Sequence, residues 1–266
     1  MKRLAERSRT KYFRLAGSNP SYQFLREFCD INRTLKVSSF CSFKYLQDRD
    51  LGFLQHGGIV SLFFGAESFA EEDHSRALNK HYNVDSAGKT ISALSDMGIF
   101  SHVNFIHPVP LATRSSEEKT LSRIRELLSG KRCSVLFSVP KMTPNTVWWD
   151  TPKRFNVVLD RETFLHYFVF HRFASDGAVD GYTINGKTLP QIQGELFTLS
   201  EVMREMGIPA GINNEDALAA HAMHIAPKEF FLDTRSALYF FDYAKIARLV
   251  ADVNRAIDAD YHGTAK

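Results

Sequence analysis

Short apolar runs alternate with amphipathic stretches along the first 160 residues of the chain. The apolar runs are rich in Val, Ile, Phe and Tyr and predict strands, while the stretches between them repeat apolar residues at helical spacing. This alternation is typical of repeated β-α units that build a parallel sheet. The predicted strands are 12–16, 36–43, 59–65, 101–107 and 133–139, and the predicted helices are 21–35, 47–56, 71–78, 86–97 and 116–128.

The third of these runs, IVSLFFG at 59–65, is nearly continuous in apolar residues. Such a strand is expected to be covered on both faces. The chain becomes irregular at 140–152, where three prolines surround Trp148 and Trp149, and this segment is interpreted as a rim loop. The tryptophan pair can stack on a substrate or cover the open side of a barrel, and we favour the cover.

Beyond residue 160 the pattern changes from alternating units to longer helical stretches. Residues 155–159 predict one more short strand, and 164–173 form an aromatic run interpreted as core. Predicted helices follow at 189–206, 214–224 and 243–259. We therefore expect an α/β fold, with repeated β-α units and a parallel sheet over 1–160 and a mainly helical C-terminal extension over 161–266.

Composition and charge narrow the function classes. The chain has 266 residues, of which 44% are hydrophobic, which is enough for a sizeable core. Its 33 basic and 30 acidic residues leave a net charge of +3, and only the start, 1–11, is mildly basic, so nucleic acid is not implied. No apolar run is long enough for a secretory signal or a membrane span, which predicts a soluble, cytoplasmic protein.

Neither cysteines nor histidines form a recognisable metal motif. Cys29 and Cys41 lie twelve positions apart and Cys133 is remote, a spacing that fits no disulfide framework, zinc site or iron-sulfur site. We expect buried or free thiols. His221 and His224 lie one helical turn apart, but the glutamate of a helical HExxH site is absent, so no metal site is predicted.

Polar residues at the ends of the predicted strands are the candidates for chemistry, because loops that leave the carboxyl ends of parallel strands build the active sites of β/α barrels. A glycine there lets a ligand approach the backbone, and a carboxylate beside a hydroxyl can bond a sugar or an amino acid. The candidates are Gly17, Ser18, Ser39, Gly65, Glu67, Ser68, Asn104 and His107.

Each candidate also has a structural interpretation. Glu67 in a near-apolar strand end either faces a ligand or is neutralised by a basic neighbour. Asn104 either contacts a cofactor or is a satisfied polar group inside the barrel. His107 either takes part in the site or packs and bonds to the backbone.

Three segments resemble radical S-adenosylmethionine (SAM) enzymes. LFFGAESFAEEDHSRALNK at 62–80 resembles their fourth-strand segment, especially in the members often joined to a cobalamin-binding domain. VNFIHPVP at 103–110 occupies the place of a strand that usually ends in gly-x-pro, with His107 in place of the glycine. SVPKMTPNTVWW at 138–149 is similar to the pro-rich loop of the family, with Asn145 where glycine is usual; asparagine tolerates left-handed backbone angles.

The resemblance covers about residues 10–160 and implies a partial parallel β/α barrel over 1–160 that binds SAM. It implies that Glu67 and Ser68 bind the ribose or methionine part of SAM, with Asn104 in the same cleft. Gly17 and Ser18 stand where the family motif contacts the SAM amino group. The family also uses a four-iron four-sulfur cluster, held by a CxxxCxxC loop after the first strand, to cleave SAM reductively.

That cysteine loop is absent from this sequence. The resemblance therefore implies that the chain begins after the first strand of the family, with 1–11 as the end of the following helix and 12–16 as the second strand. A partner chain or an upstream domain would supply the cluster, and a cobalamin domain is possible in a parent protein. The substrate and reaction stay open.

Alternatives to the radical SAM interpretation remain. The second hypothesis is a barrel that serves as a binding or partner protein without a cluster, or is an inactive truncated product. The third is an ordinary barrel hydrolase or aldolase; against it, the strand ends show no lysine, paired carboxylates or metal cluster in a recognisable arrangement.

Overall fold

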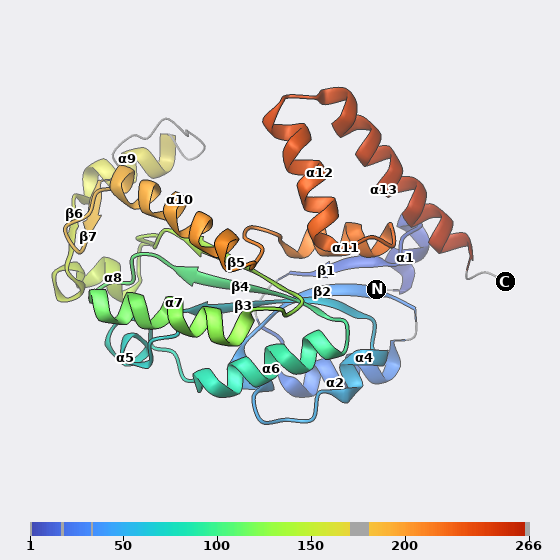
Figure 1. Ribbon diagram of the computed structural model, residues 1–266, viewed down its shortest axis with the longest axis horizontal. Helices are drawn as coiled ribbons and strands as arrows, with labels where there is room; N and C mark the ends of the chain where they lie inside the picture. Colours follow the sequence, from blue (N-terminus) through green and yellow to red (C-terminus); the bar gives the residue numbers. More distant parts are fainter. Residues whose placement is uncertain (1, 17–18, 33, 171–180, 264–266) are drawn as a thin grey trace.

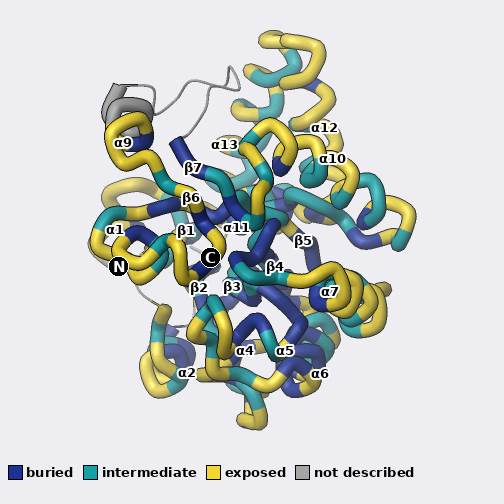
Figure 2. Tube along the Cα trace, turned by 90° about the vertical axis from the view of Figure 1, so that its left-hand side faces the viewer, coloured by how far each residue is buried: buried dark blue, intermediate teal, exposed yellow. Residues whose placement is uncertain are grey.

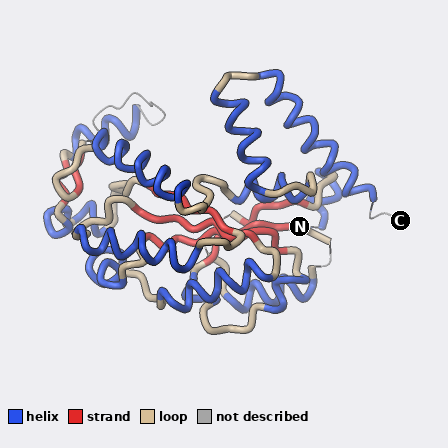
Figure 3. Tube along the Cα trace, viewed as in Figure 1, coloured by secondary structure: helices blue, strands red, loops and turns tan. Residues whose placement is uncertain are grey.

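A five-stranded parallel sheet forms the centre of the molecule (Figures 1 and 3). The computed structural model describes residues 2–16, 19–32, 34–170 and 181–263. The strand order β1-β2-β3-β4-β5 follows the chain, and within the described residues β1 and β5 do not pair with each other. The sheet is therefore open, in agreement with the partial barrel that the sequence resemblance implies. The strands are β1 (Tyr12–Leu15), β2 (Lys36–Cys41), β3 (Ile59–Glu67), β4 (Phe100–Ile106) and β5 (Cys133–Ser138).

Helices from the crossover connections cover one face of this sheet, the helix-covered face (Figure 1). The main ones start at polar caps: Ser21, Asn83 and Thr113 each accept a hydrogen bond from a backbone N–H in the first turn of the helix. The helices of this part are α1 (Lys2–Ser8), α2 (Tyr22–Ile31), α3 (Phe43–Leu46), α4 (Gly52–His56), α5 (Glu71–Asp73), the π-helix η1 (His74–Leu78), α6 (Val84–Asp96) and α7 (Arg114–Leu128).

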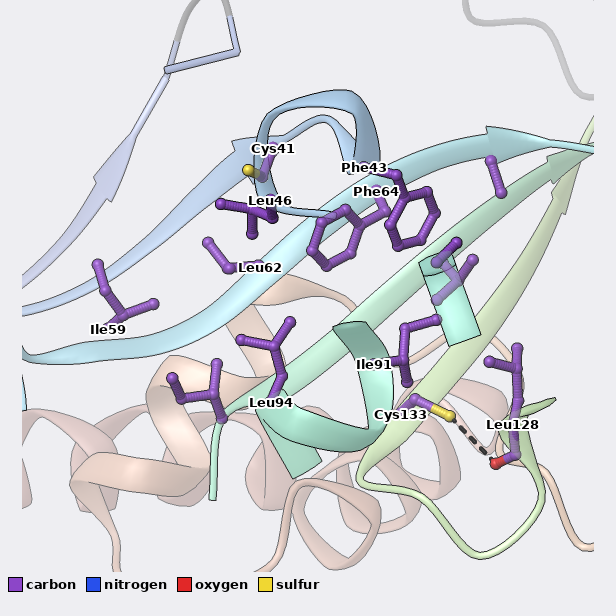
Figure 4. Close-up of a cluster of buried hydrophobic side chains, with 14 of the residues drawn as sticks. Cys41, Phe43, Leu46, Ile59, Leu62, Phe64, Ile91, Leu94, Leu128 and Cys133 are labelled. Atoms are coloured by element: carbon purple, nitrogen blue, oxygen red, sulfur yellow. Dashed lines mark hydrogen bonds between the residues drawn. The ribbon is translucent and has the colours of Figure 1, made fainter. Parts of the chain in front are cut away.

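The core between sheet and helices is apolar and closely packed (Figure 4). Phe64 of β3 is fully buried and stacks on Phe43, with ring centroids 4.3 Å apart. Gly88 lets α6 approach α7, since a β-carbon at this position would lie 2.6 Å from a methyl group of Leu127. Burial of this apolar surface is the main force that fixes the sheet against its helices.

The expected helix 47–56 is shorter than the pattern predicts. Strand β2 ends earlier than expected, and α3 takes up the residues that follow it. α4 begins only at Gly52, whose N–H donates to the Asp50 side chain. The Asp50 carboxylate therefore fixes a turn before α4, and 47–51 stay outside a helix.

The opposite face of the sheet, here called the α11 face, meets the C-terminal helices. Asn214, the first residue of α11, is buried there: it accepts a hydrogen bond from Ser61 of β3 and donates one to the Ser39 carbonyl of β2. A mainly helical C-terminal region is present as expected, although its third helix is not anticipated by the sequence pattern. Its helices are α10 (Leu189–Glu205), α11 (Asn214–Ala222), α12 (Pro227–Tyr239) and α13 (Tyr243–Gly263).

A small second core lies beyond the carboxyl ends of the strands. Trp149 packs edge-to-face on Phe164, and Trp148 donates its indole N–H to the Ala77 carbonyl, so the pair covers this core. Strand β6 (Val157–Leu159) pairs antiparallel with β7 (Tyr182–Ile184), which joins segments on both sides of residue 160. The remaining elements of this part are α8 (Val147–Asp150), η2 (Pro152–Phe155) and α9 (Arg161–Phe170). Asn145 has a φ of 64°, the left-handed conformation that asparagine tolerates.

Candidate functional site

The end of β3 turns the Glu67 side chain back over the sheet. The pairing of β3 with β4 shifts by one residue between Gly65 and Glu67, and Glu67 itself has a φ of 65°. A non-glycine residue in this left-handed region is uncommon and is held there by its surroundings. The extra residue and the unusual backbone together place the Glu67 carboxylate beside Asn104 of β4.

Four polar side chains meet at this point and form what is called here the strand-end cluster: Glu67, Lys80, Asn104 and Ser138. The Glu67 Oε1 atom lies 3.1 Å from Lys80 Nζ, and Asn104 Nδ2 donates to Oε2 at 3.2 Å. Ser138 of β5 donates to Asn104 Oδ1 at 2.7 Å. The cluster thus links the carboxyl ends of three adjacent parallel strands.

Gly65 makes room for this cluster. A β-carbon at Gly65 would lie 2.6 Å from Glu67 Oε1, and Lys80 Nζ donates to the Gly65 carbonyl at 3.0 Å. From the sequence, Gly65 is expected to let a ligand approach the backbone; in the structure, the space above Gly65 is taken by the chain's own ion pair. The sequence leaves open whether Glu67 faces a ligand or is neutralised by a basic neighbour. In the structure Lys80 is that basic neighbour.

A buried polar network fixes the turn that follows. The Ser68 hydroxyl is 1% exposed, donates to Asp73 at 2.8 Å and lies 2.9 Å from the Thr120 hydroxyl. Burial raises the pKa of Asp73, although its bonds from Ser68 and Ser116 act in the opposite direction. The Ser68 hydroxyl is therefore bonded inside the protein and stabilises the turn.

Two aromatic side chains complete this network. Tyr82 donates to the Ala66 and Ser68 carbonyls, each at 2.9 Å, and the His74 ring contacts the Ser68 carbonyl at 2.7 Å. Burial raises the pKa of Tyr82 well above its ordinary value, and the carboxylates of Glu67 and Glu71 raise it further. Burial lowers the pKa of His74. Because these shifts favour the neutral forms, both groups act as hydrogen-bond partners of the turn at neutral pH.

His107 lies near the strand-end cluster but has partners of its own. Its Nε2 atom is 2.7 Å from Glu195 of α10, which also pairs with Lys187 at 2.9 Å. A cavity of about 80 Å³ is lined by residues that include Glu67, Ser68, His107 and Glu117. A volume of this size holds only a few water molecules. His107 therefore links β4 to α10 beside the candidate site.

The remaining candidates are not brought into this group. Ser39 pairs in register with Leu62, a residue of the helix-covered core, and its hydroxyl donates to the Phe40 carbonyl. Since paired residues point to the same side of a sheet, Ser39 lies on the helix-covered face. Gly17 and Ser18 lie outside the described residues.

The α11 face continues from the strand-end cluster as a mixed polar and aromatic surface. The Arg14 guanidinium lies over the Phe40 ring, 4.9 Å from its centroid, and pairs with Glu215 at the start of α11. Phe40 meets Phe63 edge-to-face at 4.8 Å. The Arg14 and Glu215 side chains are 41% and 50% exposed, and Phe40 and Phe63 are half-buried, so both charges and rings reach the surface here.

His102 is the most unusual residue of this face. It is 2% exposed, and neither of its ring nitrogens has a hydrogen-bond partner at normal geometry. Its ring packs on Phe63 at 4.8 Å. Burial lowers its pKa to about 4, with a smaller opposing effect from the backbone of Ile212 and the carboxylate of Glu215.

Two members of the strand-end cluster, Lys80 and Ser138, are not among the candidates that the sequence offers. Both lie within the segments that resemble radical SAM enzymes, at the end of 62–80 and at the start of 138–149. Asn79, with a φ of 49°, ends η1 in the left-handed conformation immediately before Lys80. A lysine after such a helix end is a signal too common to single out without the structure.

The cysteines of this chain do not fit an iron-sulfur cluster. Cys29, Cys41 and Cys133 are all buried in the helix-covered core, on α2, β2 and β5 respectively. Burial raises their pKa values to about 11, 12 and 12, whereas cluster ligands are thiolates. In the described part of the chain, no group of three or more His, Cys, Asp or Glu side chains is arranged to hold a metal ion.

Comparisons with known proteins give structural neighbours but no family assignment. No protein-family profile matches the sequence, and no curated protein shows a significant match. The chain is similar to the radical SAM methyltransferase TsrM of Kitasatospora setae, solved with cobalamin and a four-iron four-sulfur cluster bound (14% identity, 44% of this chain, 23% of TsrM, TM-score 0.38). It is also similar to coproporphyrinogen III oxidase of Escherichia coli, a radical SAM enzyme (15% identity, 80% of this chain, 46% of the oxidase, TM-score 0.48).

Radical SAM enzymes are among the neighbours, as the sequence resemblance predicts. A third neighbour is an N-terminally deleted Elp3 of Methanocaldococcus infernus (12% identity, 57% of this chain, 43% of that chain, TM-score 0.42). The chain spans less than half of the length of each of these proteins, and the similarity concerns the fold alone. Among the described helices, none combines the length and apolar character needed to cross a bilayer.

Proposed function

We propose that the α11 face of the sheet binds SAM at the strand-end cluster, and that this chain is the SAM-binding barrel of a radical SAM-type enzyme. One observation carries the proposal: Glu67, Asn104 and Ser138 form a hydrogen-bonded row across three adjacent strand ends on the face that the crossover helices leave free. The segments that resemble radical SAM enzymes contain the same residues.

The donor set suits a zwitterionic ligand with hydroxyl groups. The Glu67 carboxylate offers about four lone-pair sites, and its bonds to Lys80 and Asn104 leave acceptors for an ammonium group or ribose hydroxyls. The Lys80 ammonium uses two of its three N–H donors on Gly65 and Glu67, which leaves one for a carboxylate. The Phe40 and Phe63 rings lie on the same face and can stack on an adenine.

Radical cleavage of SAM requires a cluster that the three buried cysteines do not supply. In this proposal the cluster is held by residues outside the chain, on a partner chain or another domain. A binding protein without a cluster is the second candidate function, and the buried thiols with their raised pKa values agree with both candidates.

Calorimetric titration of the chain with SAM tests the binding step. We expect saturable binding that Glu67→Gln weakens about tenfold, because a charge-assisted hydrogen bond contributes about 1.5 to 3 kcal/mol. Glu118→Gln is the matched control, since Glu118 forms only an exposed ion pair with Arg114 on α7. Unchanged affinity in Glu67→Gln, or no binding by the unaltered chain, refutes the proposed site.

Anaerobic reconstitution with iron and sulfide tests whether this chain can hold a cluster by itself. We expect the chain alone to bind SAM without gaining the absorbance of an iron-sulfur cluster and without cleaving SAM under reducing conditions. A stable cluster that disappears when the cysteines are replaced by serine contradicts our assignment of the cluster to another chain or domain.

A further inference from the structure

An apolar groove with a basic margin lies between α10 and α12, away from the strand-end cluster. A cavity of about 240 Å³ opens there, lined by Ile208, Pro209 and Ile212 below and by Phe231 and Leu232 of α12 on one side. Figure 1 shows α12 and α13 standing away from the sheet, and Figure 2 shows long exposed stretches on both helices.

The groove continues along α12 as a stripe in which basic and apolar side chains alternate. Lys228, Leu232, Arg235 and Tyr239 are spaced by four, three and four positions, so they share one side of the helix. Leu232 and Tyr239 are 57% and 77% exposed. The stripe therefore alternates basic and apolar side chains at intervals of about one turn over about 16 Å of helix, with its two apolar anchors, Leu232 and Tyr239, two turns apart.

Charge is divided between two sides of α12. Asp233 points to α13, where it pairs with Lys245 at 3.1 Å, whereas Lys228 and Arg235 line the groove and the surface beside it. On the α10 wall, Arg204 is neutralised by Glu201 at 2.8 Å. The groove side of α12 thus carries two basic side chains without an ion pair among the described residues, although Arg235 lies over the Phe231 ring, 5.0 Å from its centroid, and acts on the Asp216 carboxylate.

We propose that this groove docks an acidic amphipathic helix of a partner protein. Its apolar residues would enter the cavity beside Leu232 and cover Tyr239, and its carboxylates would face Lys228 and Arg235. In helix-in-groove recognition, the docked helix places apolar anchors at positions such as i, i+4 and i+7 into the groove. The length of the stripe favours a helix over a small carboxylate, which would fill only the cavity. The proposal is independent of SAM binding.

Fluorescence anisotropy with a designed peptide tests this docking. The probe is a labelled helical peptide of about 14 residues with leucines at i, i+4, i+7 and i+11 and glutamates on both flanks. We expect binding that weakens with added salt, as for any charge-assisted interface. A peptide with lysines in place of the glutamates, and one of scrambled order, are the controls and should bind at least about tenfold more weakly.

Charge reversal in the protein sharpens the test. Lys228→Glu with Arg235→Glu should weaken the glutamate peptide about tenfold and strengthen the lysine peptide. Leu232→Ser should weaken both, whereas Val158→Ser, a similarly exposed apolar position on β6, should change neither. Because all these side chains are exposed, the variants should keep the unfolding temperature of the parent chain.

Three results would overturn the proposal. Equal binding of the glutamate and lysine peptides removes the role of charge. Displacement of the peptide by free 4-phenylbutyrate at the same concentration assigns the cavity to a small carboxylate. A concentration-dependent dimer in sedimentation velocity that Leu232→Ser abolishes assigns the groove to a second copy of this chain.

Discussion

The two faces of the central sheet differ in chemistry although they are built from the same strands. Along β3, Leu62 and Phe64 enter the helix-covered core, where both are fully buried. Their neighbours Phe63 and Glu67 lie on the α11 face, which is only partly covered. Alternation along a strand thus divides the side chains within a few residues: one face holds the fold together, and the other carries the polar groups of the strand-end cluster.

The largest expected difference between the faces concerns the adjacent residues Phe64 and Phe63. Phe64→Ala should lower the free energy of unfolding by about 3 to 5 kcal/mol, because it leaves a cavity in a closely packed core. Phe63→Ala should cost only about 1 to 2 kcal/mol, since its ring is partly exposed. Urea denaturation of both variants measures the two values. Equal losses would show that both faces contribute alike to stability.

Protonation of His102 should have the next largest effect. Its folded-state pKa is lowered to about 4 from the ordinary 6.5, so the unfolded chain binds the proton more readily. The stabilisation is complete above pH 6.5 and is lost as the pH falls through this window, by on the order of 3 kcal/mol.

Urea denaturation between pH 7 and pH 4 measures this loss. His102→Phe keeps an aromatic ring against Phe63 and removes the titrating group, so its free energy of unfolding should fall less across the same range. Identical pH profiles for the two proteins would exclude His102 as the source.

The sheet is predictable from sequence because each strand is marked by apolar residues that lie next to one another in the chain. The run at 59–65 is apolar over a whole strand, and only a strand covered by helices accommodates such a run at this length. Helix caps such as Thr113 are equally local, since they bond within their own first turn. The third helix of the C-terminal region, α12, is missed because its exposed apolar side chains weaken the helical pattern.

The candidate site is only partly predictable because it depends on register. Ser38 and Ser39 are equivalent in the sequence, yet a shift in the pairing of β2 with β3 at Val37 decides which of them lies on the helix-covered face. A displacement by one residue exchanges the two faces of a strand. Lys80 joins Glu67 from thirteen positions away, a contact that no local pattern encodes.

A smaller effect is expected from the network that supports the turn after β3. Tyr82→Phe removes the hydroxyl that bonds the Ala66 and Ser68 carbonyls and should lower the free energy of unfolding by about 1 kcal/mol. It should also weaken SAM binding, because the same turn holds Glu67 in its left-handed conformation. The control is Tyr45→Phe, since the Tyr45 hydroxyl has no hydrogen bond in the described part of the chain. Thermal unfolding and calorimetric titration report the two effects separately.

Gly65→Ala should have the smallest effect on stability and a clear effect on binding. The new methyl group would lie 2.6 Å from Glu67 Oε1, so the carboxylate must turn away from Lys80. Because this ion pair is partly exposed, its disruption should cost less than about 1 kcal/mol of stability. SAM affinity should nevertheless fall about tenfold if the carboxylate position selects the ligand. A large loss of stability with unchanged affinity would place Gly65 among the residues that maintain the fold and remove the strand-end cluster from the binding site.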